Sequence, residues 1–344
     1  MTRLDPVPCP ADEIVAPADL RALVVIPCLN EEAFIGPLLR QILADAALVD
    51  PLVVVADGGS SDRTRAIVAD MAADDARVVL MDNPKRLQSA GVNLAARVHG
   101  QGRAWLVRID AHATYPHAYA SDLIAEGRRI GAASVVVSMD TVGEPGFQRA
   151  VAAAQTSALG TGGSAHRRPG AGGGYVDHGH HALFRMADFL ACGGYDETFS
   201  HNEDAELDYR LRQAGHRIWM SGKTQMIYYP RSSLKGLYFQ YLGYGRGRAK
   251  NVLKHRMIPK VRQMIPLLVF PVVLLAALSF VHWVAAVPLL IWASVCLGYG
   301  LWSAVRQRSP GAALAGVSAM VMHFGWSVGF WLQLLGLRSQ RRVA

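Results

Sequence analysis

Short apolar runs alternate with segments of helical spacing through residues 22–139, and this alternation constrains the fold more than any other feature. We expect strands at 22–27, 52–55, 78–81, 104–109 and 135–139. Predicted helices lie between them, at 35–43, 64–71 and 88–99. Because strands that alternate with helices build parallel sheets, the sequence predicts an α/β, Rossmann-like, mostly parallel sheet with helices on both faces.

Three of these runs end in short polar residues, at Asn30, Asp57 and Asp110. Ligands of parallel sheets collect beyond the carboxyl ends of the strands, so these side chains are candidates for one site. Gly58 and Gly59 let a ligand approach the backbone closely, and the Asp57 carboxylate can accept hydrogen bonds from a uracil N–H or a ribose hydroxyl. A turn that caps the following helix is the alternative interpretation of this segment.

Asp110 and His112 flank a single alanine at the end of a predicted strand. On an extended backbone their side chains point to the same side, so one cation can reach both. A carboxylate with an imidazole suits Mn²⁺ or Mg²⁺ that bridges a diphosphate and neutralises charge on a departing nucleotide. A plain polar turn after the strand is the alternative.

The C-terminal part is strongly apolar. Segments 265–280 and 283–304 are almost free of charge and predict a helical hairpin across a bilayer. A third apolar segment, 312–337, is long enough for one span but contains His323. A single crossing would place the basic tail with Arg338, Arg341 and Arg342 outside, against the charge rule, so a re-entrant or strongly tilted segment is the alternative.

The net charge of +8 is unevenly distributed. Seven basic residues crowd into the segment directly before the apolar part: Arg246, Arg248, Lys250, Lys254, Arg256, Lys260 and Arg262. Such a run favours anionic headgroups or phosphates. No helix-turn-helix, zinc-finger or aromatic-basic RNA pattern accompanies it, so nucleic acid is not expected as a partner.

Cysteine spacing and the N-terminus bear on the compartment. Cys9, Cys28, Cys192 and Cys296 are far apart and form no CxxC pair, which argues against a zinc site or a disulfide framework. The first 20 residues lack an apolar stretch of signal-peptide length. We therefore expect a multi-pass protein of the inner (cytoplasmic) membrane whose catalytic domain faces the cytoplasm.

Four motifs carry a family resemblance: segment 24–31, segment 57–64, Asp110 with His112, and Glu203 with Asp204. In this order they resemble the motifs of family 2 glycosyltransferases, inverting enzymes of the GT-A fold, over roughly residues 20–225. Segment 203–210 and the hydrophobic C-terminal part look most similar to the membrane-anchored glucosyltransferases of bacterial succinoglycan-type exopolysaccharide synthesis.

The resemblance implies roles for the residues that match these motifs. The nucleotide-binding residues would be Pro27, Asn30, Glu31 and Asp57, and Asp110 would bind both cation and donor. The family usually has an aspartate at position 112, and the histidine makes a nitrogen-tolerant ion such as Mn²⁺ more fitting than Mg²⁺. Asp204 would be the base that deprotonates the acceptor hydroxyl, because a carboxylate at a helix N-terminus is held by backbone N–H groups.

Further candidates come from less specific segments. Asp177, His178 and Glu203 are expected on the acceptor side. Arg246 and Arg248 stand where processive relatives carry Gln-x-x-Arg-Trp; they suit a pyrophosphate, and membrane-surface charge explains them equally well. The tryptophan is absent, which favours transfer of a single sugar. The glycine-rich segment 160–174, with its basic residues at 166–168, is a candidate for a loop that closes over the diphosphate once the donor binds; a disordered, solvated loop is the alternative.

These expectations divide the chain into an N-terminal extension (1–20), a GT-A domain (21–232), a basic interfacial segment (233–263), a membrane region (264–337, with the hairpin at 264–304) and a basic tail (338–344). The expected reaction moves a hexose, glucose from UDP-glucose, to a polyprenyl-diphosphate-linked saccharide in exopolysaccharide synthesis. One alternative is a polyprenyl-phosphate glycosyltransferase similar to dolichyl-phosphate mannose synthase. Another is a catalytically idle membrane subunit of an assembly complex.

Overall fold

The computed structural model describes residues 20–167, 170, 172–259 and 261–337. Within them, one 8-stranded sheet has the order β3-β2-β1-β4-β7-β5-β8-β6. The strands are β1 Ala22–Cys28, β2 Leu52–Asp57, β3 Val78–Asp82, β4 Trp105–Arg108, β5 Ser134–Thr141, β6 Gly174–Val176, β7 His180–Arg185 and β8 Ile218–Tyr228. Strands β3, β2, β1 and β4 are parallel, as the alternating sequence pattern predicts.

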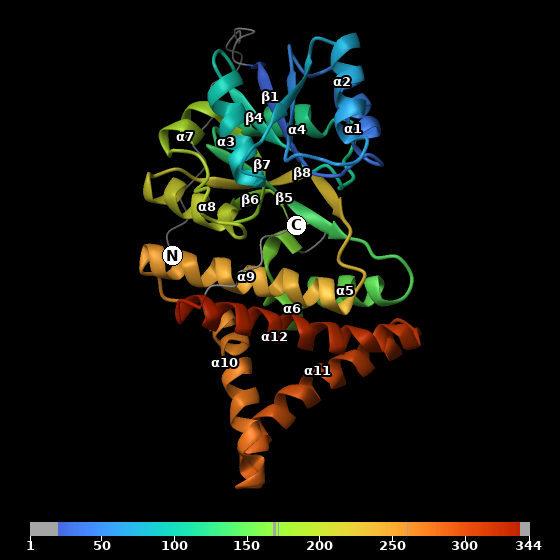
Figure 1. Ribbon diagram of the computed structural model, residues 1–344, viewed down its shortest axis with the longest axis vertical. Helices are drawn as coiled ribbons and strands as arrows, with labels where there is room; N and C mark the ends of the chain where they lie inside the picture. Colours follow the sequence, from blue (N-terminus) through green and yellow to red (C-terminus); the bar gives the residue numbers. More distant parts are fainter. Residues whose placement is uncertain (1–19, 168–169, 171, 260, 338–344) are drawn as a thin grey trace.

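The other half of the sheet is mixed. Strand β7 runs antiparallel to both of its neighbours, β4 and β5, while β5 pairs in parallel with β8. Short β6 closes the edge antiparallel to β8. The helices are α1 Ile35–Leu43, α2 Thr64–Asp74, α3 Gln88–His99, α4 Tyr119–Ile130, α5 Phe147–Thr156, α6 Ala158–Thr161, α7 Met186–Ala191, α8 Glu203–Gln213 and α9 Leu234–His255. The sheet with its helices forms the upper body in Figure 1.

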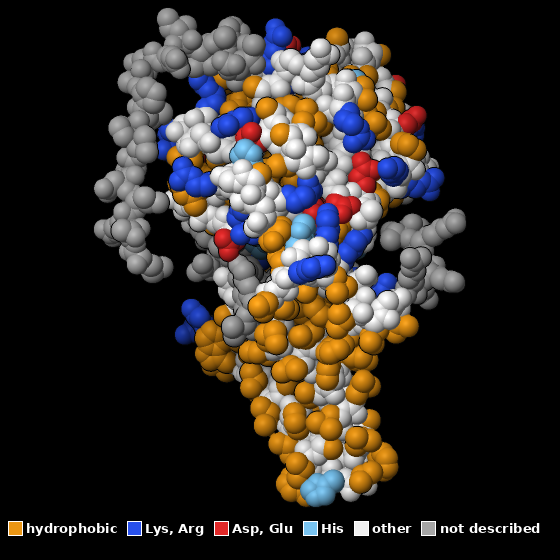
Figure 2. All heavy atoms as spheres, turned by 90° about the vertical axis from the view of Figure 1, so that its left-hand side faces the viewer, with side chains coloured by type: hydrophobic (Ala, Val, Ile, Leu, Met, Phe, Trp, Pro, Cys, Tyr) orange, Lys and Arg blue, Asp and Glu red, His pale blue; other side chains and the backbone are white. Residues whose placement is uncertain are grey.

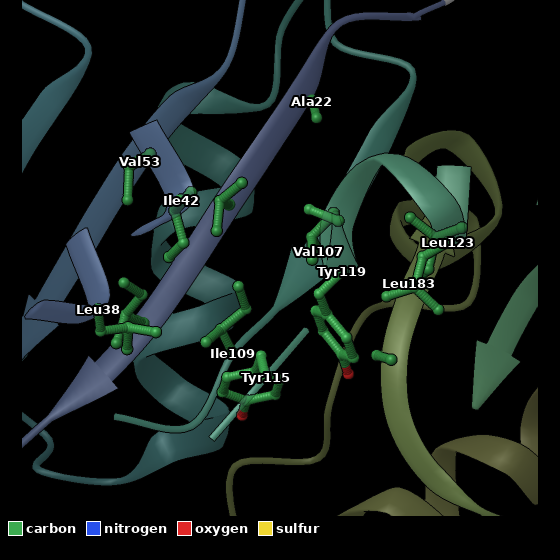
Figure 3. Close-up of a cluster of buried hydrophobic side chains, with 14 of the residues drawn as sticks. Ala22, Leu38, Ile42, Val53, Val107, Ile109, Tyr115, Tyr119, Leu123 and Leu183 are labelled. Atoms are coloured by element: carbon green, nitrogen blue, oxygen red, sulfur yellow. The ribbon is translucent and has the colours of Figure 1, made fainter. Parts of the chain in front are cut away.

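Side chains alternate between the two faces of each strand, so the sheet has one hydrophobic core on each face. Val24 and Ile26 of β1 face one side, where they pack with α1, α2 and α4 in the cluster shown in Figure 3. Leu23 and Val25 face the other side and pack with α3, α7 and α8. Because β1 is buried on both faces, it reads as one continuous apolar run, as central parallel strands do.

Three further helices are long and apolar enough to cross a membrane, by length and composition: α10 Val261–Ala276, α11 Val287–Arg306 and α12 Leu314–Leu334. Helices α10 and α11 form a hairpin that projects away from the sheet (Figure 1). Hydrophobic side chains cover the hairpin (Figure 2), and His282 lies in the connection between its two helices.

Helix α12 differs from the hairpin. It lies alongside α9 and crosses α10 at a large angle (Figure 1), and 56% of its apolar window is buried within the protein, against 6% and 11% for the two hairpin segments. A Cβ at Gly329 would come within 2.1 Å of the Leu242 carbonyl oxygen, and one at Gly245 within 1.9 Å of the Trp326 carbonyl oxygen. These glycines therefore let α9 and α12 pack backbone to backbone.

Candidate active site

The predicted polar strand ends meet at one edge of the sheet. Strands β2, β1 and β4 are adjacent, so Asp57, Asn30 and Asp110 lie side by side beyond their carboxyl ends. The Asn30 amide N–H donates to Ser60 Oγ at 2.8 Å, which joins the loops after β1 and β2. Glu31 extends this link to the third loop, because its Oε1 lies 3.0 Å from His112 Nδ1.

Asp57 organises the loop that follows it. Its buried Oδ2 accepts hydrogen bonds from the Gly59 N–H at 2.9 Å, the Ser60 N–H at 3.1 Å and Arg65 Nη1 at 2.7 Å, and its Oδ1 accepts one from Ser60 Oγ at 2.5 Å. Burial alone would raise the pKa of Asp57, but these hydrogen bonds hold it below its usual range. Both carboxylate oxygens are thus hydrogen-bonded within the protein. The groups of this loop that are available to a ligand are therefore mainly backbone N–H and C=O groups.

Asp110 and His112 lie in the loop after β4, but their side chains have different partners. Asp110 Oδ1 is buried without a hydrogen bond, whereas Oδ2 lies 3.4 Å from His180 Nε2. Burial alone would raise the pKa of Asp110, and the nearby Arg108 charge outweighs this and lowers it. The hydrogen bond to Glu31 raises the pKa of His112, which must lose its proton to bind a metal.

These groups fit a divalent cation that shares its ligands with a diphosphate. An orphaned carboxylate oxygen on Asp110 and the imidazoles of His112 and His180 are suitable donors for Mn²⁺ or Mg²⁺. In the described part of the chain, no group of three or more His, Cys, Asp or Glu side chains is arranged to hold an ion. A cation at this edge would therefore need phosphate oxygens to complete its coordination.

Glu203 and Asp204 begin α8, directly after Asn202, whose φ of 62° is left-handed. They face Arg108, a guanidinium that is 4% exposed. Its Nη1 lies 2.7 Å from Asp204 Oδ1, its Nη2 lies 3.7 Å from Glu203 Oε1, and its Nε lies 3.6 Å from Asp110 Oδ1. The structure therefore brings Asp110, Glu203 and Asp204 together around one buried cation.

The two acids respond to Arg108 differently. Burial alone would raise both pKa values, and for Asp204 the close Arg108 charge reverses this and lowers the pKa. Burial and the neighbouring Asp204 charge raise the pKa of Glu203 to about 7. Asp204 is thus the ionised member of the pair near neutral pH, and Glu203 is the member that titrates there.

A network of imidazoles and carboxylates that was not predicted from the sequence contacts Asp204. His181 of β7 lies with its Nδ1 3.3 Å from Asp204 Oδ1 and its Nε2 2.8 Å from Asp208 Oδ1. Asp208 also lies 2.8 Å from His178 Nδ1. Burial alone would lower the pKa of His181, but the carboxylates of Asp208 and Asp204 raise it. Asp208 shares a helix face with Asp204, four residues earlier, and this spacing was the available sequence signal.

The structure separates the other acceptor-side candidates. His178 joins this network through Asp208, and Asp177 points outward, 61% exposed and 3.8 Å from Arg212. Arg246 and Arg248 lie on α9, on either side of Gly247, whose backbone packs against His201 and Asn202 at the start of α8. The α9 backbone between them thus contacts the segment before the acidic pair, and Arg246 Nε is buried without a hydrogen bond.

The basic residues of the glycine-rich segment take other positions. Arg167 is buried, with its guanidinium 5.0 Å from the Tyr228 ring centre and its Nη1 3.5 Å from Gln155 Oε1. The His166 ring packs edge-on against His178. Arg168 lies outside the described residues.

Arg231, which follows β8, was not singled out from the sequence. Its positive charge acts to lower the pKa of both His112 and His201.

Comparisons with known proteins agree with this geometry. The family model "Glycosyl transferase family 2" matches residues 23–191. The chain is 56% identical over 323 residues to "Succinoglycan biosynthesis protein ExoA" of Rhizobium meliloti (strain 1021), which covers 94% of this chain and 97% of that protein.

Among solved structures, the fold resembles a mannosyltransferase, PcManGT from Pyrobaculum calidifontis in complex with GDP-Man and Mn²⁺. The TM-score is 0.54 at 18% identity, and the match covers 90% of this chain and 89% of that chain. At this identity the likeness concerns the fold alone. With the extensive similarity to the succinoglycan protein, these findings show that the chain belongs to glycosyl transferase family 2 and has a GT-A-type catalytic fold.

Proposed function

We propose that this glycosyltransferase moves glucose from UDP-glucose, with inversion, to a lipid-linked saccharide during exopolysaccharide synthesis. The observation that carries the proposal is Arg108, which joins the candidate cation ligand Asp110 to the acidic pair at the start of α8. In this proposal Asp110 is the donor-side carboxylate and Asp204 the acceptor-side carboxylate, with the buried Arg108 charge between them. The name of the relative supports succinoglycan-type synthesis as the pathway.

On the donor side, the loops after β1 and β2 would hold the nucleotide. Asn30 and Glu31 are fixed by hydrogen bonds to Ser60 and Thr64, at 2.8 Å each, so the backbone at Pro27 and Gly58 is held in place for the base and ribose. Asp110, with His112 and His180, would hold Mn²⁺ or Mg²⁺, which supplies positive charge to the leaving diphosphate. The PcManGT complex with GDP-Man and Mn²⁺ supports nucleotide-sugar and metal use in this fold.

On the acceptor side, Asp204 would take the proton of the attacking hydroxyl. Its Oδ1 is fixed by Arg108 and His181, while none of the described side chains hydrogen-bonds to Oδ2. Fixing one oxygen orients the other, which is the geometry that a general base needs. Glu203, the neighbour whose pKa lies near 7, would contact the acceptor sugar.

The membrane region supports a site near the lipid surface. If the α10–α11 hairpin crosses the bilayer, α12 lies along the membrane surface together with α9, because it crosses the hairpin at a large angle (Figure 1). Arg306 and Arg308 then stay on the same side as the basic residues of α9, in accordance with the charge rule. This arrangement favours the re-entrant or tilted alternative for segment 312–337 and a cytoplasmic catalytic domain.

One observation favours a second candidate, transfer directly to polyprenyl phosphate. Asp204 is ion-paired with Arg108 and has a lowered pKa, which weakens it as a base, and a phosphate acceptor is already an anion that needs none. Asp204→Asn separates the two functions. Loss of transfer to a saccharide hydroxyl supports the first, and full activity with polyprenyl phosphate supports the second.

The experiment that tests the proposal is a donor screen by nucleotide release. Purified full-length protein is mixed with lipid extract from an exopolysaccharide-producing strain, Mn²⁺ and each of several UDP- and GDP-sugars, with and without chelator. We expect UDP release from UDP-glucose only, dependent on both lipid and metal. Release from a different sugar nucleotide would overturn the donor, and lipid-independent release would overturn the acceptor class.

A further inference from the structure

A groove separates the catalytic domain from the membrane hairpin. It has a volume of about 700 Å³ and lies between α5–α6 on one side and α11 on the other. Ser157 and Leu159 line the catalytic wall, and Tyr299, Trp302 and Arg306 line the hairpin wall. Its volume falls within the range of ligand pockets, roughly 300–1,000 Å³. We refer to it as the juxtamembrane groove.

The hairpin wall is amphipathic along its length. The rings of Tyr299 and Trp302 lie 5.7 Å apart, and the Arg306 guanidinium lies 5.1 Å from the Trp302 ring centre. Tyrosine and tryptophan are enriched at the level of the headgroups, where one end of the ring is apolar and the other wet. Arg306 is the last residue of α11, and Trp302 and Tyr299 lie about one and two turns before it, so the hairpin wall has a cation at the end of the helix and aromatic rings along it.

A chain of residue contacts leads from the catalytic wall of the groove to the segment before α8. Gln155 of α5 is a neighbour of the lining residues Thr156 and Ser157, and its Oε1 accepts from Arg167. The buried Arg167 charge acts on Tyr244, whose carbonyl oxygen accepts from Asn202 Nδ2 at 2.7 Å. Asn202 precedes the acidic pair, so packed side chains join the groove to the start of α8.

We propose that the juxtamembrane groove binds the lipid end of the acceptor, a polyprenyl diphosphate, with Arg306 on a phosphate and the isoprenoid chain along Tyr299 and Trp302. The nature of the lipid rests on the proposed function. A guanidinium pairs well with phosphate oxygens, and the aromatic rings match an unsaturated hydrocarbon chain. A phospholipid that only coats the hairpin needs no wall from the catalytic domain, which is why we assign the groove to the substrate.

Photolabelling tests this inference without requiring sugar transfer. The probe is a polyprenyl diphosphate that carries a diazirine in its isoprenoid chain, and the full-length protein is reconstituted in phosphatidylcholine nanodiscs. We expect crosslinks in 153–159 and 299–307, displaced by unlabelled polyprenyl diphosphate but not by equal amounts of phosphatidylglycerol. Crosslinks elsewhere, or equal displacement by phosphatidylglycerol, would overturn the proposal.

Two arginines at the end of α11 provide a matched pair of variants. Arg306 lines the groove, whereas Arg308, two residues later, does not line it. We expect Arg306→Gln to raise the half-saturating probe concentration about tenfold, Arg306→Lys to restore most of the binding, and Arg308→Gln to change it less than twofold. Equal effects of Arg306→Gln and Arg308→Gln would indicate nonspecific surface charge and contradict the proposal.

The proposed function and the proposed lipid site can be disproved independently of each other. If no sugar is transferred to any lipid but the probe still labels the groove, the proposed function is wrong and the lipid site stands. If transfer occurs and labelling maps outside the groove, the proposed function stands and the lipid site is wrong. Ala158→Trp, which fills the catalytic wall while keeping Arg306, should reduce labelling in the same way as Arg306→Gln, and unchanged labelling would count against the groove.

Discussion

Arg108 Nη1 lies 2.7 Å from Asp204 Oδ1, and this ion pair joins a strand of the parallel half of the sheet to the first turn of α8. The same buried guanidinium lies within 3.7 Å of carboxylate oxygens on Asp110 and Glu203. Three carboxylates thus share one guanidinium. Burying a charge is costly unless it remains paired, so the cluster is sensitive to the loss of this cation.

Arg108→Gln should therefore destabilise the protein. Removing the buried guanidinium takes away the main compensating charge of Asp204 and Asp110, and breaking a buried pair of this kind costs about 3–5 kcal/mol. The measurement is thermal unfolding of the detergent-solubilised protein by intrinsic fluorescence. Arg128→Gln, at an exposed position of α4, is the control, and equal melting temperatures for the two variants would contradict the role of Arg108.

Glu203→Gln should increase stability at alkaline pH. The folded-state pKa of about 7 lies above the ordinary value of 4.5, so protonation of Glu203 favours folding below about pH 4.5 and this contribution is lost as pH rises to 7. A neutral glutamine avoids the burial of charge above pH 7. We expect the variant to gain about 1–3 kcal/mol relative to wild type at pH 8 compared with pH 5. A pH-independent difference, or one like that of the exposed Glu144→Gln control, would contradict this.

Asp204→Asn should lower turnover much more than substrate binding. Loss of a general base typically reduces turnover by about 10²–10⁴-fold, while the KM for the donor stays within a few-fold because Asp204 does not belong to the nucleotide loops. Steady-state UDP release with varied donor measures both constants. A large rise in donor KM at unchanged turnover would assign Asp204 to donor binding instead.

His112→Asp should shift the metal preference. An imidazole ligand suits Mn²⁺ better than Mg²⁺, and the substitution gives the cation a second carboxylate instead. Activity with Mg²⁺ relative to Mn²⁺ should rise several-fold, measured by titrating each ion into metal-depleted enzyme. His99→Asp, on α3, is the control for a nonspecific gain of negative charge, and an unchanged ratio in His112→Asp would exclude His112 as a ligand.

Single-cysteine labelling should reveal that α12 does not cross the membrane. Cysteines that replace Arg308 and Leu335, before and after α12, should both react from the cytoplasmic side. A cysteine that replaces His282, in the connection between the hairpin helices, should react from the opposite side. Impermeant maleimide on sealed inside-out and right-side-out vesicles distinguishes the two sides. Labelling of positions 308 and 335 from opposite sides would show that α12 spans the bilayer.

The part of the site that follows from local pattern was predictable from the sequence. Strand alternation predicted Asp57 and Asp110 at one sheet edge, because the carboxyl ends of parallel strands meet at the same edge of a sheet. Helices at 35–43 and 88–99 match α1 and α3. Arg108, inside an apolar run, had no local signal, since its function depends on α8 being packed against β4.

His180 and His181 were missed for a related reason. They lie on β7, which inserts antiparallel between β4 and β5, and no local pattern in the sequence specifies that insertion. Helix α9 was also missed, because Gly243, Gly245 and Gly247 lower its helix propensity. Tertiary packing overrides that propensity: Gly245 permits the close contact with α12, and Gly243 and Gly247 permit the contact with His201 before α8.

The most direct test of the central claim is transfer of radiolabelled glucose from UDP-glucose into the lipid phase by purified protein with Mn²⁺. Wild type is compared with Asp110→Asn, Asp204→Asn and the exposed control Asp70→Asn. The account predicts lipid-phase label for wild type and Asp70→Asn, and at least a hundredfold loss in each of the other two variants. Turnover within a few-fold of wild type in either Asp110→Asn or Asp204→Asn would contradict it.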